Sequence, residues 1–367
     1  MGLAEEKTLP DNARILIIRF SSLGDLVKCT ALPRLIKNRY PRAHVTLLTA
    51  REFVALVEGN PQVDRAIGFD RRGGAKAFFK LVGKLRQERF DLIVDVHKSL
   101  RSRALGLFLK APHTRYNKRT WQRLLLIHFR INTYNPPRGK EEDFLAGLLP
   151  YGIRDDGRGT ELNIQPLASD PTLLEKLKPG LATLAGWKKA GRPIIGIAPV
   201  AAWPLKRWPM ASFQTLVQQY LELTNGGVVL FGGPDDREVE SLLKDAGDRG
   251  VSMVGKTTHL ESAYVGSLCD LVVSNDTGMA HLSEAVGVDV LMLFGPTSRE
   301  LGYYPVRQGS EALEIDLSCR PCTRTGKGRC TNSTWQACMA GITPAMVVER
   351  LTARLAAMGY SSGGRSS

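Results

Sequence analysis

The sequence predicts an α/β protein made of two Rossmann-like domains with parallel sheets that face a central cleft. Short runs of β-branched and aliphatic residues alternate with amphipathic helical stretches, which is typical of parallel sheets covered by helices. This alternation runs through the first half of the chain and begins again at Pro193. With 367 residues, the chain is also longer than one ordinary domain of roughly 100–200 residues.

In the first half, four apolar runs are expected to form buried strands. They lie at residues 14–20, 45–48, 63–68 and 91–96. Helices are expected between them at 26–39, 51–57, 75–87 and from Ser99, and a short one at 141–149. Residues 121–134 mix aromatic, basic and apolar side chains, so they form either an amphipathic surface segment or an ordinary helix packed on the sheet. We therefore expect the first domain to span residues 1–165.

The second half repeats the pattern after a polar region, residues 166–192, which we interpret as a linker with one helix. Strands are expected at 193–198, 228–231, 251–254, 271–274 and 290–294. Helices are expected between and after them at 210–223, 236–246, 261–267, 279–286 and 344–358. The predicted second domain spans 193–343, and a C-terminal helix follows at 344–360.

The positive charge is confined to one half of the chain. The formal net charge is +14, and residues 1–165 hold 30 Lys and Arg against 17 Asp and Glu, leaving 20 against 19 for the rest. Residues 96–140 contain no acidic residue at all. A basic region confined to one half of the chain predicts an anionic partner. This partner is either nucleic acid, an anionic membrane surface or an acidic acceptor.

The N-terminal residues are acidic and polar and lack the apolar core of a secretory signal. No apolar run approaches the roughly 20 residues that span a bilayer. A cytoplasmic location is therefore expected.

Residues 269–297 contain the most distinctive pattern, a strand, a turn (Asn275 to Gly278), a helix and a second strand. The N-terminus of a helix that follows an open glycine-containing turn offers free N–H groups and suits a phosphate. Asp276 and His281 flank this point. The alternative is an ordinary βαβ unit with a well-capped helix.

Other polar residues also follow predicted strands directly, so they are expected at the carboxyl edges of the sheets, where ligands bind. Asp25 suits a general base or, alternatively, a helix cap. Lys206 lies in a basic loop that suits a diphosphate or is a solvated turn. Residues 232–234 (Gly-Gly-Pro) either let a ligand approach the backbone or form a plain turn.

Neither a G-x-G-x-x-G nor a G-x-x-x-x-G-K-[ST] motif is present, so dinucleotide oxidoreduction and P-loop hydrolysis are unsupported. Four cysteines with the spacing C-x2-C-x7-C-x7-C could form a zinc site, although free thiols fit the spacing better. They are Cys319, Cys322, Cys330 and Cys338. Cys29 and Cys269 stand among apolar residues and are expected in the core.

Taken together, four landmarks resemble glycosyltransferase family 9, the ADP-heptose:lipopolysaccharide heptosyltransferases. They are RILIIRFSSLGD at 14–25, FDLIVDVHKSLRSRAL at 90–105, WPLKRWP at 203–209 and LVVSNDTGMAHLSEAVGVDVLMLFGPT at 271–297. The resemblance implies a GT-B fold whose C-terminal helix crosses back to the first domain. It also implies an inverting, metal-independent transfer of heptose without a cofactor.

The resemblance further implies roles for individual residues. Asp25 would take the proton from the acceptor hydroxyl, and Lys206 would neutralise the leaving diphosphate. The acceptor would contact Ser22, Gly24, Lys98 and Arg101. The donor would contact Ala201, Ala202, Gly232, Gly233, Pro234, Asp276, Thr277, Gly278, Met279 and His281.

The partners implied are ADP-heptose, a lipid A–Kdo or heptosylated lipid acceptor, and an anionic cytoplasmic membrane surface touched peripherally. One alternative is a family relative that transfers another nucleotide-activated sugar to a surface glycan. A second is a basic nucleic-acid-binding protein, against which the nearly neutral second half and the turn at 275–278 argue.

Overall fold

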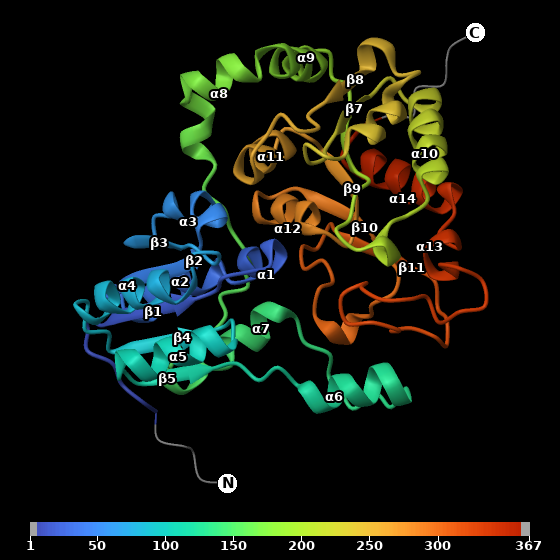
Figure 1. Cartoon of the computed structure of the whole chain (residues 1–367). Coiled ribbons are helices and arrows are strands. Elements are labelled where there is room, and N and C mark those ends of the chain that lie inside the picture. The colour runs from blue at the N-terminus through green and yellow to red at the C-terminus, as the bar shows by residue number, and fades with distance from the viewer. Residues whose placement is uncertain (1–5, 361–367) are drawn as a thin grey trace. The chain divides into compact units, whose positions relative to one another are not determined.

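The computed structural model describes residues 6–360, which form two compact units (Figure 1). The first unit comprises residues up to 120 together with 138–163, and the second comprises 121–137 together with the chain from 164 onward. Residues 121–137 therefore group with the second unit, although they fall within the sequence range expected for the first domain.

The first unit contains a five-stranded parallel sheet with the order β3-β2-β1-β4-β5. The central strand β1 is buried between two neighbours, with Ile15 in register with Val45 and Leu92. Its aliphatic side chains alternate between the two faces, so both faces of the sheet contribute to the core. The strands are β1 (Arg14–Ile18), β2 (His44–Ala50), β3 (Arg65–Phe69), β4 (Leu92–Asp95) and β5 (His113–Arg115).

One helix expected at 26–39 is in fact two, because the chain breaks at Cys29 and Thr30. Pro33 consequently lies in the first turn of the second helix, where its missing N–H disrupts no helical hydrogen bond. The helical segments of this unit are α1 (Leu23–Lys28), α2 (Ala31–Arg39), η1 (Arg51–Phe53), α3 (Ala55–Glu58), α4 (Gly74–Arg86), α5 (Leu100–Leu109), α7 (Lys140–Leu145) and η3 (Leu149–Tyr151).

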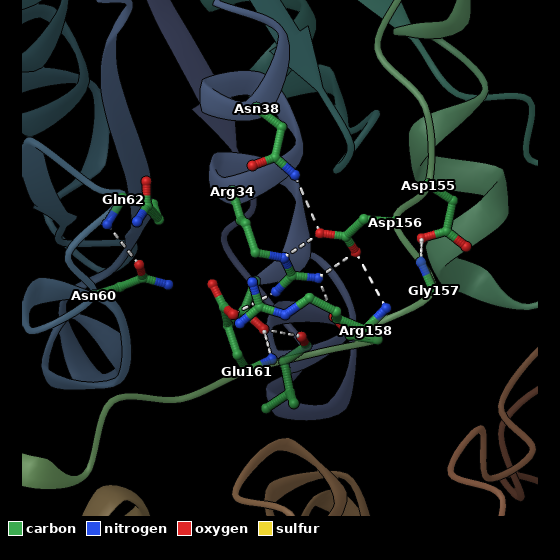
Figure 2. A network of polar contacts seen from close by, with 12 residues as sticks. Arg34, Asn38, Asn60, Gln62, Asp155, Asp156, Gly157, Arg158 and Glu161 are labelled. Atoms are coloured by element: carbon green, nitrogen blue, oxygen red, sulfur yellow. Dashed lines mark hydrogen bonds and ion pairs between the residues drawn. The ribbon is translucent and has the colours of Figure 1, made fainter. Parts of the chain in front are cut away.

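A buried arginine on α2 binds residues 156–161, near the C-terminal end of the first unit, as Figure 2 shows. The Arg34 guanidinium donates to both carboxylate oxygens of Asp156, at 2.8 and 2.9 Å, and also pairs with Glu161. A further bond of 2.8 Å reaches the carbonyl oxygen of Gly159. The hydrogen bonds from Arg34 lower the pKa of Asp156 to about 2. Residues 156–161 are thus fixed although they form no helix or strand.

The second unit contains a six-stranded parallel sheet with the order β11-β10-β9-β6-β7-β8. At its centre Ile195 of β6 is in register with Val228 and Leu271. All five residues of β9 are buried. The strands are β6 (Ile194–Ala198), β7 (Gly227–Leu230), β8 (Gly250–Ser252), β9 (Leu271–Asn275), β10 (Asp289–Phe294) and β11 (Glu311–Glu314).

Helices cover both faces of this second sheet. On one face α10 (Met210–Leu223) and α14 (Pro344–Ala357) lie side by side, with Phe213 and Leu351 in a common core (Figure 1). The opposite face is covered by residues of α8 (Pro171–Lys176), α9 (Lys178–Lys189), α11 (His259–Gly266) and α12 (Gly278–Ala285). Because the apolar side of α14 packs within the second unit, the expected crossing of this helix to the first domain stays a prediction.

Several expected elements differ in the structure. The supposed linker contains two helices, α8 and α9, and Leu184 and Trp187 of α9 pack on the sheet. The helix expected at 236–246 is a 3-10 helix, η6 (Arg237–Leu243), and the edge strands β5 and β11 were not predicted. Short further segments are η4 (Gln165–Ser169), η5 (Pro204–Lys206), η7 (Gly247–Arg249), η8 (Arg299–Leu301) and α13 (Ala337–Ala340).

Residues 121–134 fold as a helical surface segment. The helix α6 (Thr120–Leu124) continues into a π-helical turn, η2 (Leu125–Phe129). Of the side chains in η2, only Leu126 is buried. This segment is therefore mainly a surface element and not a helix with a broad face packed on a sheet. No helix among residues 6–360 is long and apolar enough to cross a membrane.

Replacing Arg34 by Met is expected to lower the free energy of unfolding by about 2–3 kcal/mol, because Asp156 and Glu161 lose the cation that compensates them in a partly buried site. Urea unfolding followed by circular dichroism measures this loss. Arg42→Met is the matched control, since Arg42 and Asp11 form an exposed pair, and it should change stability by less than about 0.5 kcal/mol. Equal effects of the two substitutions would contradict a structural role of Arg34.

Candidate active site

The carboxyl edge of the first sheet holds Asp25 in the first turn of α1. Its Oδ2 accepts a hydrogen bond of 2.9 Å from the hydroxyl of Ser22 and one of 3.3 Å from the backbone N–H of the same residue. The alternative for Asp25 was the N-cap of this helix, but Ser22 occupies that position, and Asp25 contributes to the cap from the first turn of α1. The same contacts also fix the position of its carboxylate.

Arg19 forms an ion pair with Asp25, and the sequence reasoning missed it. The guanidinium of Arg19 is almost fully buried, also donates to the carbonyl oxygen of Val96 and lies over the ring of Phe144 at 5.3 Å. It therefore links the ends of β1 and β4 and places a positive charge beside Asp25. The available signal was its position as a charge directly after four consecutive aliphatic residues, 15–18.

The other residues expected at the acceptor side differ in burial and in hydrogen-bond partners. They are Gly24, Lys98 and Arg101. Gly24 is a half-buried residue of α1. Lys98 follows β4, and its ammonium donates to the carbonyl oxygen of Tyr116 at 3.3 Å. Arg101 lies on the exposed surface of α5 and donates to the carbonyl oxygen of Arg71. Both cations thus have backbone partners within the first unit.

His97, which is half-buried, and Lys28, which is buried, are two further titratable groups of the first unit. Burial, followed by the charge of Arg19, lowers the pKa of His97 to about 4, so its ring is neutral near pH 7. Lys28, the last residue of α1, is buried and pairs with Glu141 of α7 at 2.7 Å. Buried charge pairs of this kind are stable only with good geometry, so the position of α1 depends on the Glu141 contact.

In the second unit, Lys206 and Asp276 form a direct ion pair of 2.5 Å between Nζ and Oδ2. The side chains are 13% and 3% exposed, respectively, so water has little access to the pair. Thr297, which follows β10, donates its hydroxyl to the same Asp276 oxygen at 3.2 Å. The structure thus brings together two residues that lie 70 positions apart, and it adds Thr297, which the sequence reasoning did not identify.

Asn275 fixes the loop that carries Lys206 to the end of β9. Its side-chain oxygen accepts from the backbone N–H of Trp208 at 3.0 Å, and its amide nitrogen donates to the carbonyl oxygen of Pro199 at 2.7 Å. Asn275 is fully buried, so both bonds are protected from water. The indole N–H of Trp208 donates in turn to the carbonyl oxygen of Ile342 at 2.7 Å.

The helix α12 begins at Gly278, two residues after Asp276, and the sequence predicted a helix at 279–286. Thr277 precedes its first residue in an extended conformation and makes no side-chain cap hydrogen bond. The N-terminal N–H groups of α12 therefore suit an anion at the carboxyl edge of the sheet. Gly278 and Met279 are half-buried in the first turn, whereas His281 is buried and lies near the ring of Tyr303.

The remaining predicted donor positions lie in loops after β6 and β7. Ala201 is buried and its carbonyl oxygen accepts from Arg207 at 2.8 Å, while Ala202 is exposed. At the Gly-Gly-Pro turn, residues 232–234, the N–H of Gly233 donates to the carboxylate of Asp236 at 2.8 Å. The turn is thus closed by its own aspartate, which agrees with the plain-turn alternative and leaves its ligand contacts a prediction.

All six cysteines are free thiols. Cys29 and Cys269 are buried in the core as predicted, and burial raises the pKa of Cys29 to about 12. Among the residues that the structure describes, no three His, Cys, Asp or Glu side chains are placed so that they could hold a metal ion. The zinc hypothesis for the four C-terminal cysteines therefore gains no support from the geometry.

Each unit thus carries a predicted site carboxylate that is paired with a cation at the carboxyl edge of its sheet, Asp25 with Arg19 and Asp276 with Lys206. The convergence of these two pairs on one cleft stays a prediction. Two Rossmann-like units with charged groups at these edges are typical of GT-B glycosyltransferases.

Solved structures support this class. The glycosyl transferase family 9 structure from Veillonella parvula matches with a TM-score of 0.74 at 20% identity, covering 96% of this chain and 100% of that chain. The structure of the ADP-heptose lipopolysaccharide heptosyltransferase II from Escherichia coli matches with a TM-score of 0.69 at 23% identity, covering 95% and 100%. The predicted GT-B fold is therefore confirmed.

Sequence comparison then defines the family. The model described as glycosyltransferase family 9 (heptosyltransferase) matches residues 78–330. The lipooligosaccharide heptosyltransferase 2 of Haemophilus influenzae is 28% identical over 358 residues, covering 93% of this chain and 99% of the relative. The chain belongs to glycosyltransferase family 9, and the resemblance seen in its four sequence landmarks is confirmed.

Proposed function

We propose that this protein transfers a heptose from ADP-heptose to the Kdo/heptose inner core of lipopolysaccharide, with inversion at the anomeric carbon and without a metal ion. The observation that carries the proposal is the pair of Lys206 and Asp276 beside the N-terminus of α12, in a member of a family described as heptosyltransferases. The names of the similar proteins support the heptose and the lipopolysaccharide acceptor.

On the donor side, Lys206 and the N-terminus of α12 would hold the diphosphate. Negative charge grows on the diphosphate as the bond to the anomeric carbon breaks, so a cation and helix N–H groups there stabilise the transition state. Because these groups supply positive charge themselves, the step needs no metal ion. Asp276, held by Thr297, would accept hydrogen bonds from hydroxyl groups of the heptose.

On the acceptor side, Asp25 would remove the proton from the attacking hydroxyl group. The oxygen of that hydroxyl group bonds to the anomeric carbon from the face opposite the diphosphate. The proton passes to the carboxylate, the electrons of the breaking bond stay with ADP, and the configuration inverts. Ser22 and Arg19 would orient Asp25 for this role, since both contact its carboxylate oxygen Oδ2.

Purified protein incubated with ADP-heptose and either lipid A–Kdo or heptosylated lipid acceptors should release ADP in proportion to the acceptor added. The coupled measurement of ADP tests the donor and the acceptor together. UDP- and GDP-activated sugars in parallel reactions provide the comparison. Turnover with one of these but none with ADP-heptose would replace the proposed donor by that of a family relative acting on another glycan.

Asp25→Asn is expected to reduce turnover by at least about 1,000-fold, because an amide cannot accept the proton in the transfer step. ADP binding should persist, since no donor contact is removed, and an ADP-induced thermal shift measures it. The exposed carboxylate Asp11 offers the matched control Asp11→Asn, which should retain wild-type turnover. Turnover close to wild type in the Asp25 variant would remove Asp25 as the base.

We further propose that the protein acts in the cytoplasm at the membrane surface, where a lipid-linked acceptor is available. The basic first half of the chain then serves an acidic lipid and not nucleic acid. The helical segment at 120–129 supports this proposal, since Trp121 is 75% exposed, Phe129 is 69% exposed and Arg123 lies between them in the sequence. Exposed aromatic side chains beside cations are typical of segments that lie in a membrane interface.

The double variant Trp121→Ser/Phe129→Ser is expected to bind anionic phosphatidylglycerol vesicles at least about tenfold more weakly, because two aromatic side chains no longer leave water. Vesicle co-sedimentation measures the binding, and phosphatidylcholine vesicles test the charge dependence. Trp335→Ser is a matched control, since Trp335 is also exposed but lies outside this segment. A control variant that loses as much vesicle binding as the double variant would exclude this segment as the membrane contact.

A further inference from the structure

Residues 319–338, which contain four cysteines, have no role in the function proposed above. This segment is hydrogen-bonded to the residues that follow β10. The backbone N–H of Cys322 donates to the carbonyl oxygen of Pro296 at 3.0 Å. The guanidinium of Arg320 donates to the carbonyl oxygen of Thr297 at 2.9 Å. Thr297 in turn donates to Asp276, so this end of the segment is linked through Thr297 to one partner of the Lys206–Asp276 pair.

The same segment also contacts the loop that carries the other partner. The side-chain amide of Gln336 donates to the carbonyl oxygen of Pro204 at 2.6 Å, within η5. The ammonium of Lys327 lies 5.6 Å from the centre of the Trp203 ring. Two residues that precede Lys206 in its loop, Trp203 and Pro204, are therefore in contact with one continuous segment, which extends from this loop to Thr297.

Gly326 makes the closest approach to Lys206 itself. A Cβ atom at position 326 would lie 2.7 Å from Cγ and 3.2 Å from Cδ of Lys206, and 3.1 Å from Cβ of Trp203. These are atoms of the lysine stem and not of its mobile end, so the stem would have to move. Gly326 also has a φ of +87°, a conformation that glycine adopts without strain.

We infer that Gly326 and Gln336 are positioning residues for Lys206, acting through the stem of the lysine and through the backbone of its loop. The inference rests on the proposed function, in which Lys206 contacts the diphosphate. With the stem confined by Gly326 and the loop held by Gln336, the Lys206 ammonium is directed at the carboxyl edge of the sheet beside α12. A lysine has four rotatable side-chain bonds, so such confinement reduces the entropy lost when its ammonium binds a phosphate.

The substitution Gly326→Ala tests the contact. It should weaken ADP binding by about fivefold and lower kcat by about tenfold, because the displaced stem no longer aims the ammonium at the leaving group. Gly328→Ala is the matched control, since Gly328 has a φ of +117° but nothing lies within 4 Å of its Cβ position. It introduces backbone strain in the same segment without touching Lys206, and both measurements should stay within about twofold of wild type.

A double-mutant cycle separates positioning from a general structural defect. In the Lys206→Ala background the Cγ and Cδ atoms are gone, so adding Gly326→Ala should change the Kd for ADP by less than about twofold. Calorimetry gives this Kd without requiring turnover. Gln336→Met, which removes only the donor to Pro204, should lower kcat by about threefold and provides a second variant should Gly326→Ala fold poorly.

The outcomes distinguish the inference from the proposed function. Wild-type turnover and ADP affinity in Lys206→Ala would overturn the role of Lys206 itself. Loss of turnover in Lys206→Ala together with equal behaviour of Gly326→Ala and Gly328→Ala would overturn only the positioning role. Additive effects of Gly326→Ala and Lys206→Ala on the ADP Kd would do the same.

Discussion

The ion pair between Lys206 and Asp276 is the interaction on which the arrangement of the second unit's site depends. Two charged side chains with little access to water are stable only when their geometry is held closely, because desolvation opposes their attraction. Neighbouring loops supply that geometry. Thr297 fixes the carboxylate, while Asn275 fixes the backbone after the lysine to the same strand end. The pair therefore constrains three loops that the sequence places far apart.

In the first unit a carboxylate is also held by a cation, but the residues are different. Asp25 also lies one loop after a central strand and also pairs with a cation, but here the cation is Arg19, just beyond the end of the same strand. Arg19 is fixed by the carbonyl oxygen of Val96 and by the ring of Phe144. In both units the carboxylate is held by a hydroxyl group as well as by a cation. A fixed position is what a general base or a sugar-binding carboxylate requires.

The sequence was sufficient for the features that depend on local pattern. The helix predicted at 210–223 matches α10 at both ends, because its apolar positions recur at helical spacing and Pro209 marks its start. The strand and helix around Asp276 were predicted for similar reasons. The prediction of one continuous helix at 26–39 was wrong, because apolar spacing alone does not reveal the break at Cys29 and Thr30. The edge strands β5 (HTR) and β11 (EALE) were missed because their residues are mostly polar and form no apolar run, whereas the equally short β8 was recognised.

The site was predicted only in part, because its contacts are set by tertiary structure. Asp276 directly follows β9, and Asp25 and Lys206 lie in the short segments after β1 and β6, so their position at a sheet edge follows from topology. The pairing of Lys206 with Asp276 depends on the order of β6 and β9 within the sheet, which the sequence pattern does not specify. Thr297 and Gln336 are recognisable only from the contacts they make.

The pairing of Lys206 with Asp276 also limits how the proposed transfer can proceed. An ammonium that bonds a carboxylate at 2.5 Å must share or exchange that contact when it binds a diphosphate. Asp276 does not lose all its partners in that exchange, because the Thr297 hydroxyl still donates to it, and hydroxyl groups of a sugar can take the place of the ammonium. Donor binding is then favoured when both halves of the nucleotide sugar are present, since the diphosphate engages the lysine while the sugar satisfies the carboxylate. Under the proposed donor contacts, ADP alone would draw the ammonium from Asp276 without offering the buried carboxylate a replacement donor, so the intact sugar nucleotide is expected to bind more tightly than ADP.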